Sequence, residues 1–432
     1  MGPRRLNRRR VLAGLLSPLV LTGCTIPGTA RWRASDPNTV DLWYWNRSID
    51  DTLFREFEHK HPGVTINDQK IGGDYASRVN TTLAGEAFVP AIMAFNYDIS
   101  RYFRAEDEFV DLLEYGAANV AHEYLEWKWQ LGITDSGRMI GFPMDTGPTA
   151  LFYRADFFEQ AGLPSEPADV SAMLATWDDY LDAGVEVQKA LPEVRFLDNI
   201  PNLYFMALSQ SSTFYVDREG RFVGDGDHIR RAWDIAMAAF NQGLAAHVNA
   251  FTPDWSAALN TNRVATFVGA VWMKQILMES APDTAGAWRV AQCPDGPGNQ
   301  GGSFIGITRY APDKALAYEL IRFVQSPENQ ARMYESLNLF PSALDALRSP
   351  VMDQPEEFFG GQATSAEFVR AAETLDPFYF SPAFPIAHGV VMEMVTDVAV
   401  GGRPEAGAWE EAQEQLRREL KHKAPWVKWE NN

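Results

Sequence analysis

Aromatic and short polar side chains gather near the ends of several predicted strands, where they could contact a ligand. They are Trp45 and Asn46 after the first strand, Tyr97 and Asp98 after the third, Asp145 in a later linker, and Trp255 and Trp272 around a strand of the second half. An indole or phenol face packs on the C–H face of a sugar ring, and neighbouring carboxylates and amides pair with its hydroxyls. These residues are candidate ligand contacts, and for each single aromatic residue the alternative is a place in the core.

No sequence pattern indicates catalysis. The seven histidines are scattered, and neither a His-Glu-x-x-His nor a Cys-x-x-Cys motif of a zinc site occurs. The phosphate-binding Gly-x-x-x-x-Gly-Lys and the nucleophile elbow Gly-x-Ser-x-Gly are absent as well. Two carboxylates of a glycoside hydrolase can meet in space from distant positions, so that alternative stays open. We expect a protein that is not an enzyme and holds no cofactor or metal.

The elements that must position these residues alternate between strand and helix. Strands are predicted at 39–45, 64–67, 91–95, 139–143, 149–153, 264–268 and 303–307, and early helices at 51–60 and 75–84. Such alternation indicates βαβ units and a mainly parallel sheet. Ligands of open parallel sheets bind beyond the carboxyl ends of the strands, which is where the candidate residues fall. Between the strands at 139–143 and 149–153, residues 144–148 are expected to form a short linker.

Length and charge narrow the class of protein further. The chain has 432 residues, 46% of them hydrophobic, with 38 basic against 57 acidic side chains and a net charge of −19. That length suits two large lobes, each with its own core. The acidic balance argues against nucleic acid as a partner, because binding to phosphates requires a basic surface.

The first thirty residues depart from this acidic average. Residues 1–10 carry five arginines and no acid, residues 11–21 are mainly apolar, and Leu21-Thr22-Gly23-Cys24 follows. Eleven residues are too few to span a bilayer, and the pattern is typical of an export signal. Leu21–Cys24 resembles a bacterial lipobox, in which Cys24 is acylated, while Arg8–Leu12 resembles a twin-arginine signal, so the export route stays open. We predict a signal peptide at 1–23, a lipidated flexible stalk at 24–36 and anchoring to the outer face of the cell membrane.

Three blocks of sequence carry a family resemblance. They are Gly141-Phe142-Pro143-Met144-Asp145 with Leu151–Phe158 and Thr176-Trp177; Gly301–Ile307 with Ser326-Pro327-Glu328 and Pro341; and Asn262 to Trp272. Over nearly its whole length, the chain beyond the signal peptide resembles the extracellular solute-binding proteins of family 1 from ABC importers, the group that includes maltose-binding protein.

The resemblance implies an α/β, two-lobed periplasmic-binding-protein-like fold of type II, with hinged lobes that each have a central sheet flanked by helices. Lobe 1 would comprise 37–145 and 302–340, and lobe 2 would comprise 146–301 and 341–426. Carried over by position, the ligand-binding residues are Trp45, Asn46, Tyr97, Asp98, Asp145, Trp255, Trp272, Gly302, Ser303 and His388. The lobes would close on the ligand, and the loaded form would dock on the transmembrane subunits of a permease.

We therefore expect a monomeric, lipid-anchored receptor that captures a sugar or oligosaccharide and delivers it to an ABC permease. A non-sugar solute, such as a glycerophosphodiester, a polyamine or a peptide, is the alternative within the same fold. A surface-anchored glycoside hydrolase is the alternative from another class. A phosphate-containing ligand would favour a basic cleft, whereas the candidate residues are mostly acidic or aromatic.

Overall fold

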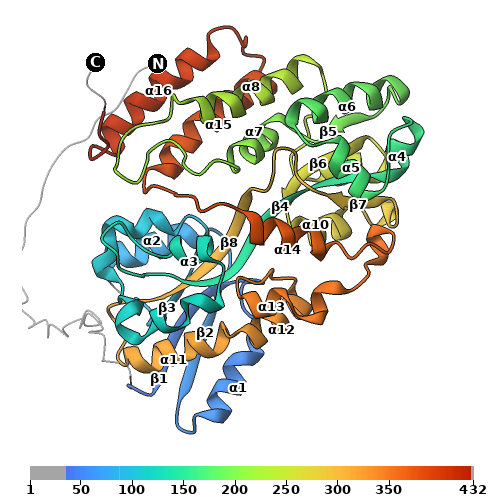
Figure 1. The fold of residues 1–432 in the computed structure, drawn as a ribbon. Helices are drawn as coiled ribbons and strands as arrows, with labels where there is room; N and C mark the ends of the chain where they lie inside the picture. The colour runs from blue at the N-terminus through green and yellow to red at the C-terminus, as the bar shows by residue number, and fades with distance from the viewer. Residues whose placement is uncertain (1–35, 87, 430–432) are drawn as a thin grey trace, which may run out of the picture.

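The computed structural model describes residues 36–86 and 88–429, so the predicted signal peptide, Cys24 and all but the last residue of the stalk lie outside it. One path of strands runs through the molecule in the order β2-β1-β3-β8-β4-β6-β5, with β7 pairing to β4 (Figure 1). The strands are β1 Thr39–Trp45, β2 Thr65–Ile71, β3 Ile92–Asn96, β4 Phe142–Arg154, β5 Arg195–Leu197, β6 Val264–Ala270, β7 Trp288–Ala291 and β8 Asn299–Ile307.

Helices cover this sheet in both lobes. In lobe 1 and its return segments they are α1 Thr52–Lys60, α2 Tyr75–Gly85, α3 Glu126–Gln130, α11 Lys314–Val324, α12 Pro327–Leu337 and α13 Leu344–Leu347, with the 3-10 segments η1 Ile99–Glu108, η2 Leu112–Tyr115 and η3 Ala117–Glu123. In lobe 2 they are α4 Ala155–Gln160, α5 Pro167–Met173, α6 Trp177–Ala190, α7 Ile200–Leu208, α8 Asp227–Asn241, α9 Pro253–Asn260, α10 Met273–Ser280, α14 Ser365–Thr374, α15 Phe384–Ala399 and α16 Ala408–Lys423, with η4 Pro282–Thr284, η5 Pro350–Asp353 and η6 Glu357–Phe359.

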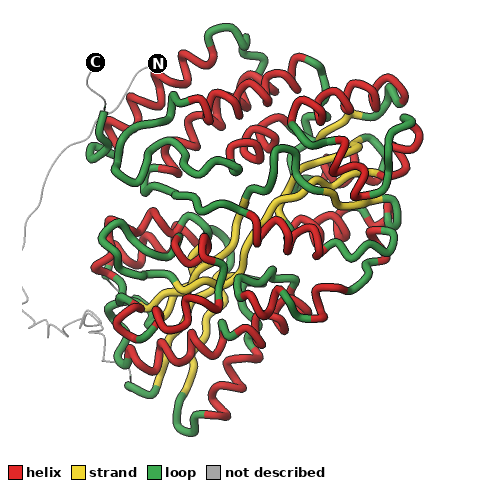
Figure 2. Tube along the Cα trace, viewed as in Figure 1, coloured by secondary structure: helices red, strands yellow, loops and turns green. Residues whose placement is uncertain are grey.

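The strands β4 and β8 join the two lobes. Figure 2 shows the strands continuing from lobe 1, in the lower part of the view, into lobe 2, in the upper part. The first part of β4 pairs with β8 beside β3, and the second part pairs with β6 and β7. The predicted linker at 144–148 is therefore wrong, because residues 142–154 form one strand of 13 residues. Register shifts on either side of Thr146 take the place of the linker, and they bend the strand where it passes between the lobes.

The sheet is mixed, not mainly parallel as the sequence predicts. β1 pairs in parallel with β2 and β3, and β5 pairs in parallel with β6. All pairings of β4 and the pairing of β3 with β8 are antiparallel. The reason is that β4 and β8 connect the lobes and pair with each other, and a βαβ pattern read along the chain does not contain this pairing.

Alternation along β1 and β3 divides the core of lobe 1 into two layers. Leu42, Tyr44 and Ile92 pack toward α1 and α11, whereas Trp43 and Met93 pack toward α2 on the opposite face. The layer on the α2 side is continuous with the core of lobe 2. Ala343 and Ala346 also pack in the layer on the α1 side.

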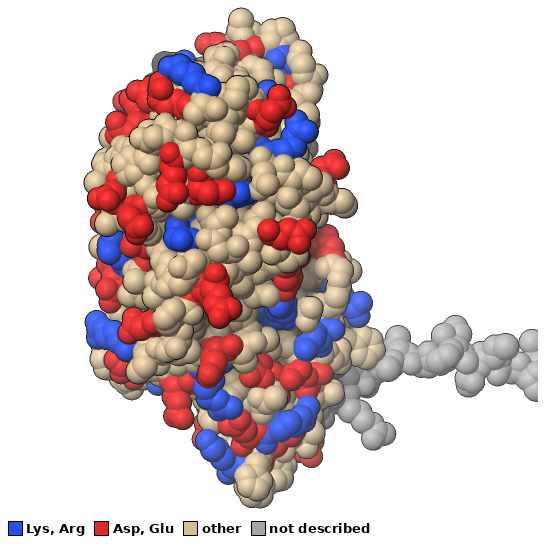
Figure 3. Space-filling model, turned by 90° about the vertical axis from the view of Figure 1, so that its right-hand side faces the viewer, with Lys and Arg blue, Asp and Glu red and all other residues tan. Residues whose placement is uncertain are grey.

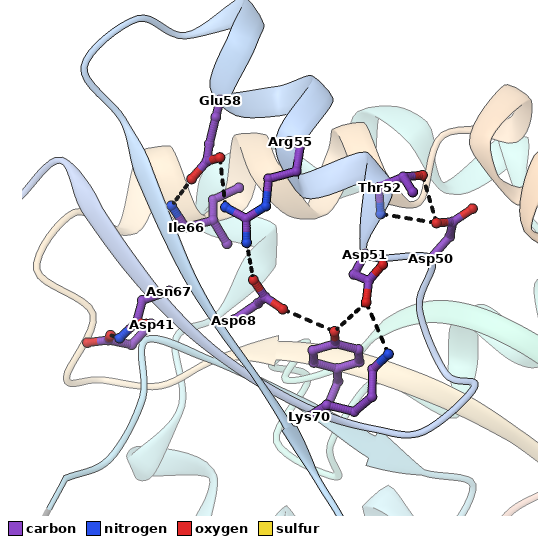
Figure 4. Close-up of polar contacts among 11 residues, drawn as sticks. Asp41, Asp50, Asp51, Thr52, Arg55, Glu58, Ile66, Asn67, Asp68 and Lys70 are labelled. Carbon is purple, nitrogen blue, oxygen red and sulfur yellow. Dashed lines mark hydrogen bonds and ion pairs between the residues drawn. The ribbon is translucent and has the colours of Figure 1, made fainter.

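A polar network ties α1 to the sheet face that it covers in lobe 1 (Figure 4). The buried Tyr44 hydroxyl donates to Asp68 at 3.1 Å and to Asp51 at 3.4 Å, and Lys70 pairs with Asp51 at 3.0 Å. Arg55 of α1 bridges Asp68 of β2 and Glu58 of its own helix. Glu58 in turn accepts a hydrogen bond from the backbone N–H of Ile66 in β2. Acidic and basic side chains thus hold α1 against the edge strand β2.

Candidate ligand-binding site

A pocket of about 280 Å³ lies where β1 and β3 end. Trp45 is the last residue of β1, Asn96 is the last residue of β3, and Asp98 immediately precedes η1. The pocket is lined by Trp45, Gly73, Asp74, Tyr75, Ala76, Asn96, Asp98, Arg101 and Tyr102. Of the predicted contacts, the structure brings Trp45 and Asp98 together here, at the carboxyl ends of neighbouring parallel strands.

Two aromatic rings form the apolar part of this pocket. Trp45 and Tyr75 lie with ring centroids 5.2 Å apart and planes tilted by 58°. The Tyr75 hydroxyl donates to the backbone oxygens of Trp43 and Ala94, at 3.1 and 2.9 Å. Burial raises the pKa of Tyr75. Because its hydroxyl is bound to the protein backbone, the ring is the part of Tyr75 that is available to the pocket. The sequence gives no direct sign of this role, since Tyr75 opens a helix instead of ending a strand.

An ion pair forms the polar part. The Asp98 carboxylate pairs with Arg101, and their side chains are 16% and 27% exposed. Burial raises the pKa of Asp98, while the charge of Arg101 acts in the opposite direction. Nε of Arg101 is buried without a hydrogen-bond partner. The pair therefore carries acceptors and donors in planar groups with no net charge, which suits the hydroxyls of a neutral polyol.

Tyr97 and Asn46 lie outside this pocket. The Tyr97 ring is edge-on to Phe380, with centroids 5.7 Å apart, and is partly buried. Asn46 is exposed in the turn after β1, next to Arg47. Arg47 pairs with Glu279 of α10 at 3.1 Å, so the end of β1 contacts lobe 2.

The predicted contacts Asp145, Gly302 and Ser303 gather at the crossing of β4 and β8, beside a residue that the prediction missed. Lys128 of α3 is 1% exposed, and its Nζ lies 3.5 Å from the ring centroid of Phe304. Burial lowers the pKa of Lys128 to about 7, against the charge of Asp145. Burial also raises the pKa of Asp145, against the charge of Lys128 and hydrogen bonding by Ser303. A lysine between two tryptophans, Trp127 and Trp129, is the signal that could have revealed a buried cation.

Trp272 lies at the start of α10 on lobe 2 and is partly exposed. Its Nε1 donates to the backbone oxygen of Gln300 in β8 at 2.9 Å. The ring of Phe251, which the sequence prediction did not select, stacks beside it with centroids 5.9 Å apart. Trp272 therefore remains a candidate ligand contact.

Trp255, predicted as a ligand contact, lies in the core of lobe 2 and does not line the pocket. The side chain is 0% exposed, lies edge-on to Phe267, and donates from Nε1 to Asp198 at 3.2 Å. The reason is the position of Trp255 in α9, where it shares the buried side of the helix with Ala258 and Leu259.

His388 lies in an aromatic cluster of lobe 2. Its Nδ1 is 3.0 Å from the Tyr215 hydroxyl, and its ring stacks on Phe384 with centroids 4.9 Å apart. Burial lowers the pKa of His388 to about 3, so the imidazole is neutral at physiological pH. The residue as a whole is partly exposed, and it does not line the pocket at the ends of β1 and β3.

The described part of the chain exposes many acidic side chains (Figure 3) and has neither a helix that could cross a membrane nor a cluster of metal ligands. Acidic side chains spread over the face drawn in Figure 3, with basic ones interspersed. Between residues 36 and 429, leaving out residue 87, no helix combines the length and the apolar composition that crossing a bilayer requires. Those same residues hold no group of three or more His, Cys, Asp or Glu side chains suited to a metal ion.

Comparison with known proteins places this architecture in a family. Residues 52–360 match the family described as bacterial extracellular solute-binding protein. The chain belongs to this family. It is 24% identical over 392 residues to the lactose-binding protein of Rhizobium radiobacter, covering 85% of this chain and 88% of that protein.

Two solved structures show the same fold. A crystal structure of an extracellular solute-binding protein of family 1 has a TM-score of 0.84 and 28% identity, and the match covers 88% of this chain and 99% of the other. A binding protein of an ABC transporter from B. animalis subsp. lactis Bl-04, in complex with β-1,6-galactobiose, has a TM-score of 0.71 and 19% identity, with 91% and 100% covered. The predicted fold class, two α/β lobes of the periplasmic-binding-protein kind, is confirmed.

Proposed function

We propose that this solute-binding protein serves an ABC importer and captures a sugar or short oligosaccharide between its lobes. The observation that carries the proposal is the pocket at the ends of β1 and β3, in which the Trp45–Tyr75 pair adjoins the Asp98–Arg101 pair. An apolar ring face beside paired donors and acceptors is the chemistry that a pyranose ring requires. The lactose-binding relative and the galactobiose complex support the same ligand class.

The charges in the pocket favour a neutral ligand over the alternatives. A glycerophosphodiester would bring its phosphate beside Asp74 and Asp98, with Arg101 already paired. A polyamine would meet the cation of Arg101, which already pairs with Asp98, while Asp74 accepts hydrogen bonds from the N–H and hydroxyl of Ser77 as the N-cap of α2. A sugar brings no charge and can use both members of the pair.

Delivery and anchoring complete the proposal. The ligand stabilises a closed arrangement by contacting both lobes, and that arrangement docks on the transmembrane subunits of the permease. Cys24, when lipidated, holds a monomer at the outer face of the cell membrane. The protein releases its ligand unchanged, without catalysis.

The test is isothermal titration calorimetry of the purified chain against a panel of mono-, di- and trisaccharides of galactose, glucose and arabinose. Spermidine and glycerophosphocholine in the same panel test the non-sugar alternatives. We expect saturable binding of at least one saccharide, and a loss of about tenfold or more in affinity for Asp98→Asn, because it removes the charged acceptor of the ion pair. The matched control is Asp234→Asn, which removes the carboxylate of an exposed ion pair with Arg230 in α8, outside this pocket, and should leave affinity unchanged.

Two results would contradict the proposal. Binding of spermidine or glycerophosphocholine without any saccharide would remove sugar as the ligand class. Release of reducing sugar from the oligosaccharides would identify a hydrolase instead of a receptor.

A further inference from the structure

Phe251 is an exposed aromatic residue that the proposed site does not use. Its side chain is 65% exposed, and among the large hydrophobic residues of the described chain only Phe88 and Val400 are comparably exposed. The Phe251 ring is nearly parallel to that of Trp272, with an interplanar angle of 18°. An apolar ring thus faces solvent directly beside a candidate ligand contact, and such exposed apolar surface is typical of a binding site.

The backbone holds Phe251 in this position. Its φ is 67°, in the left-handed region that residues with a Cβ rarely adopt. Thr252, which follows it, donates from its N–H and its hydroxyl to the backbone oxygen of Asn249, at 3.3 and 2.7 Å. The same hydroxyl accepts from the N–H of Trp255 and caps α9. Such a conformation persists where its surroundings enforce it, and it is concentrated at functional sites.

The neighbouring indole is fixed from its other side. Nε1 of Trp272 donates to the backbone oxygen of Gln300, and a Cβ on Gly301 would lie 2.9 Å from that nitrogen. Gly301 has a φ of +100°, so both the space and the backbone at this position require glycine. Trp272 is therefore held between β8 and Phe251, and the two rings form one preorganised surface.

We propose that Phe251 determines ligand size, by extending the Trp272 surface so that it binds a further ring of an oligosaccharide. The inference rests on the proposed function. Two adjacent aromatic rings offer more apolar surface than one pyranose covers, which favours a ligand of two or more rings. A monosaccharide stacked on Trp272 would not need the Phe251 ring, whereas the second ring of an oligosaccharide would contact it.

The test compares Phe251→Ala with the wild-type chain by calorimetry, using galactose, lactose, β-1,6-galactobiose and the arabinose series of one to three rings. We expect affinity for the di- or trisaccharide to fall about tenfold and affinity for the matching monosaccharide to change less than about twofold. Phe251→Tyr should restore oligosaccharide affinity, because it keeps the ring. Phe88→Ala is the matched control, since Phe88 is also 65% exposed, has a φ of 58° and lies on lobe 1.

The outcomes separate this inference from the proposed function. Saccharide binding that Phe251→Ala leaves unchanged, or weakens equally for one ring and for several, would overturn the role of Phe251 alone. If the wild-type chain binds no saccharide of the panel, the proposed function fails and the inference fails with it. A similar loss in Phe88→Ala would show a general effect on the fold and would also overturn the inference.

Discussion

Two tryptophans of lobe 2, Trp255 and Trp272, lie 17 positions apart in sequence and have different surroundings. Trp255 is on the inner side of α9, where the apolar core and Asp198 enclose it completely. Trp272 precedes α10, where its indole N–H is bound by β8 and part of its ring remains accessible. Both tryptophans lie at the start of a helix, so the local sequence does not distinguish them. The packing of each helix decides which of the two is accessible to a ligand.

Substitution of the two residues should separate their roles. Trp272→Ala is expected to lower ligand affinity more than about tenfold, because it removes a partly exposed aromatic residue that is a candidate ligand contact. Trp255→Phe is expected to leave affinity within about twofold and to lower the free energy of unfolding by about 2 kcal/mol, since the buried Asp198 loses a hydrogen bond. Calorimetry and urea denaturation measure both effects. Unchanged affinity in Trp272→Ala would mean that the ligand does not contact this ring.

Asp198 predicts a pH dependence of stability. Burial raises the pKa of its carboxyl to about 7, against hydrogen bonds from the Asn199 N–H and Trp255. In the unfolded chain an aspartate loses its proton at about pH 4, so between about pH 4 and 7 the folded protein binds more protons at this residue. The contribution of Asp198 to the free energy of unfolding therefore falls as pH rises through that range.

The variant Asp198→Asn does not titrate. The difference in unfolding free energy, variant minus wild type, should therefore rise from pH 4 to pH 7 by at most about 1.4 kcal/mol per pH unit, and level off outside that range. Urea denaturation at a series of pH values measures it. A difference that stays constant across the series would mean that the folded carboxyl is ionised throughout.

At the scale of elements, the strands β4 and β8 determine how the lobes are joined. Gly302 in β8 has a φ of +84°, and a Cβ there would lie 2.7 Å from the backbone oxygen of Asp145 and 3.0 Å from Nζ of Lys128. Both neighbours are confined, one by the β4 backbone and the other by burial over Phe304. The crossing of the two strands thus has no room for a side chain at this position.

Gly302→Ala should be much more costly than the same change at an open glycine. We expect it to lower the free energy of unfolding by about 3 kcal/mol, from left-handed strain together with the clash. Gly402→Ala, at a φ of +75° with no atom within 4 Å, isolates the strain and should cost about 1 kcal/mol. Urea denaturation of both variants measures the difference. Equal losses would show that β8 shifts to accommodate the methyl group.

At the scale of the whole molecule, polar side chains also connect the two lobes. Besides the joining strands, the exposed pair of Arg47 and Glu279 connects the turn after β1 to α10. Gln275 donates to the same Glu279 oxygen at 2.7 Å and accepts from Asn338 at 3.0 Å. These contacts connect the turn after β1 with α10 and, through Asn338, with the end of α12.

Glu279→Gln should weaken ligand binding through this connection. The pair is about half exposed, so we expect a two- to threefold loss of affinity at low salt, in line with the ~0.2–1 kcal/mol of exposed pairs. In 0.5 M NaCl the difference from wild type should disappear, because salt screens the wild-type pair. The control is Asp234→Asn, which breaks the exposed pair with Arg230 inside α8 and leaves affinity unchanged. A loss that persists at high salt would indicate a change in shape instead of lost charge attraction.

The sequence by itself determined the local structure and the family. The strand at 39–45 and the helices predicted at 51–60 and 75–84 form within a residue of their predicted bounds, because alternation and helical periodicity act between near neighbours. The blocks around Asp145 and Gly302 likewise carried the resemblance that the family match confirms. At the ends of β1 and β3, strand order was enough to bring Trp45 and Asp98 together.

Only the tertiary structure decided which side chains face a ligand and how the lobes are joined. It placed Trp255 in the core, brought Lys128 beside Asp145, and set Tyr75 and Phe251 next to predicted contacts. It also made β4 and β8 antiparallel neighbours across both lobes. These features depend on contacts between residues far apart in the chain, and a local pattern holds no information on which distant element will cover a given face.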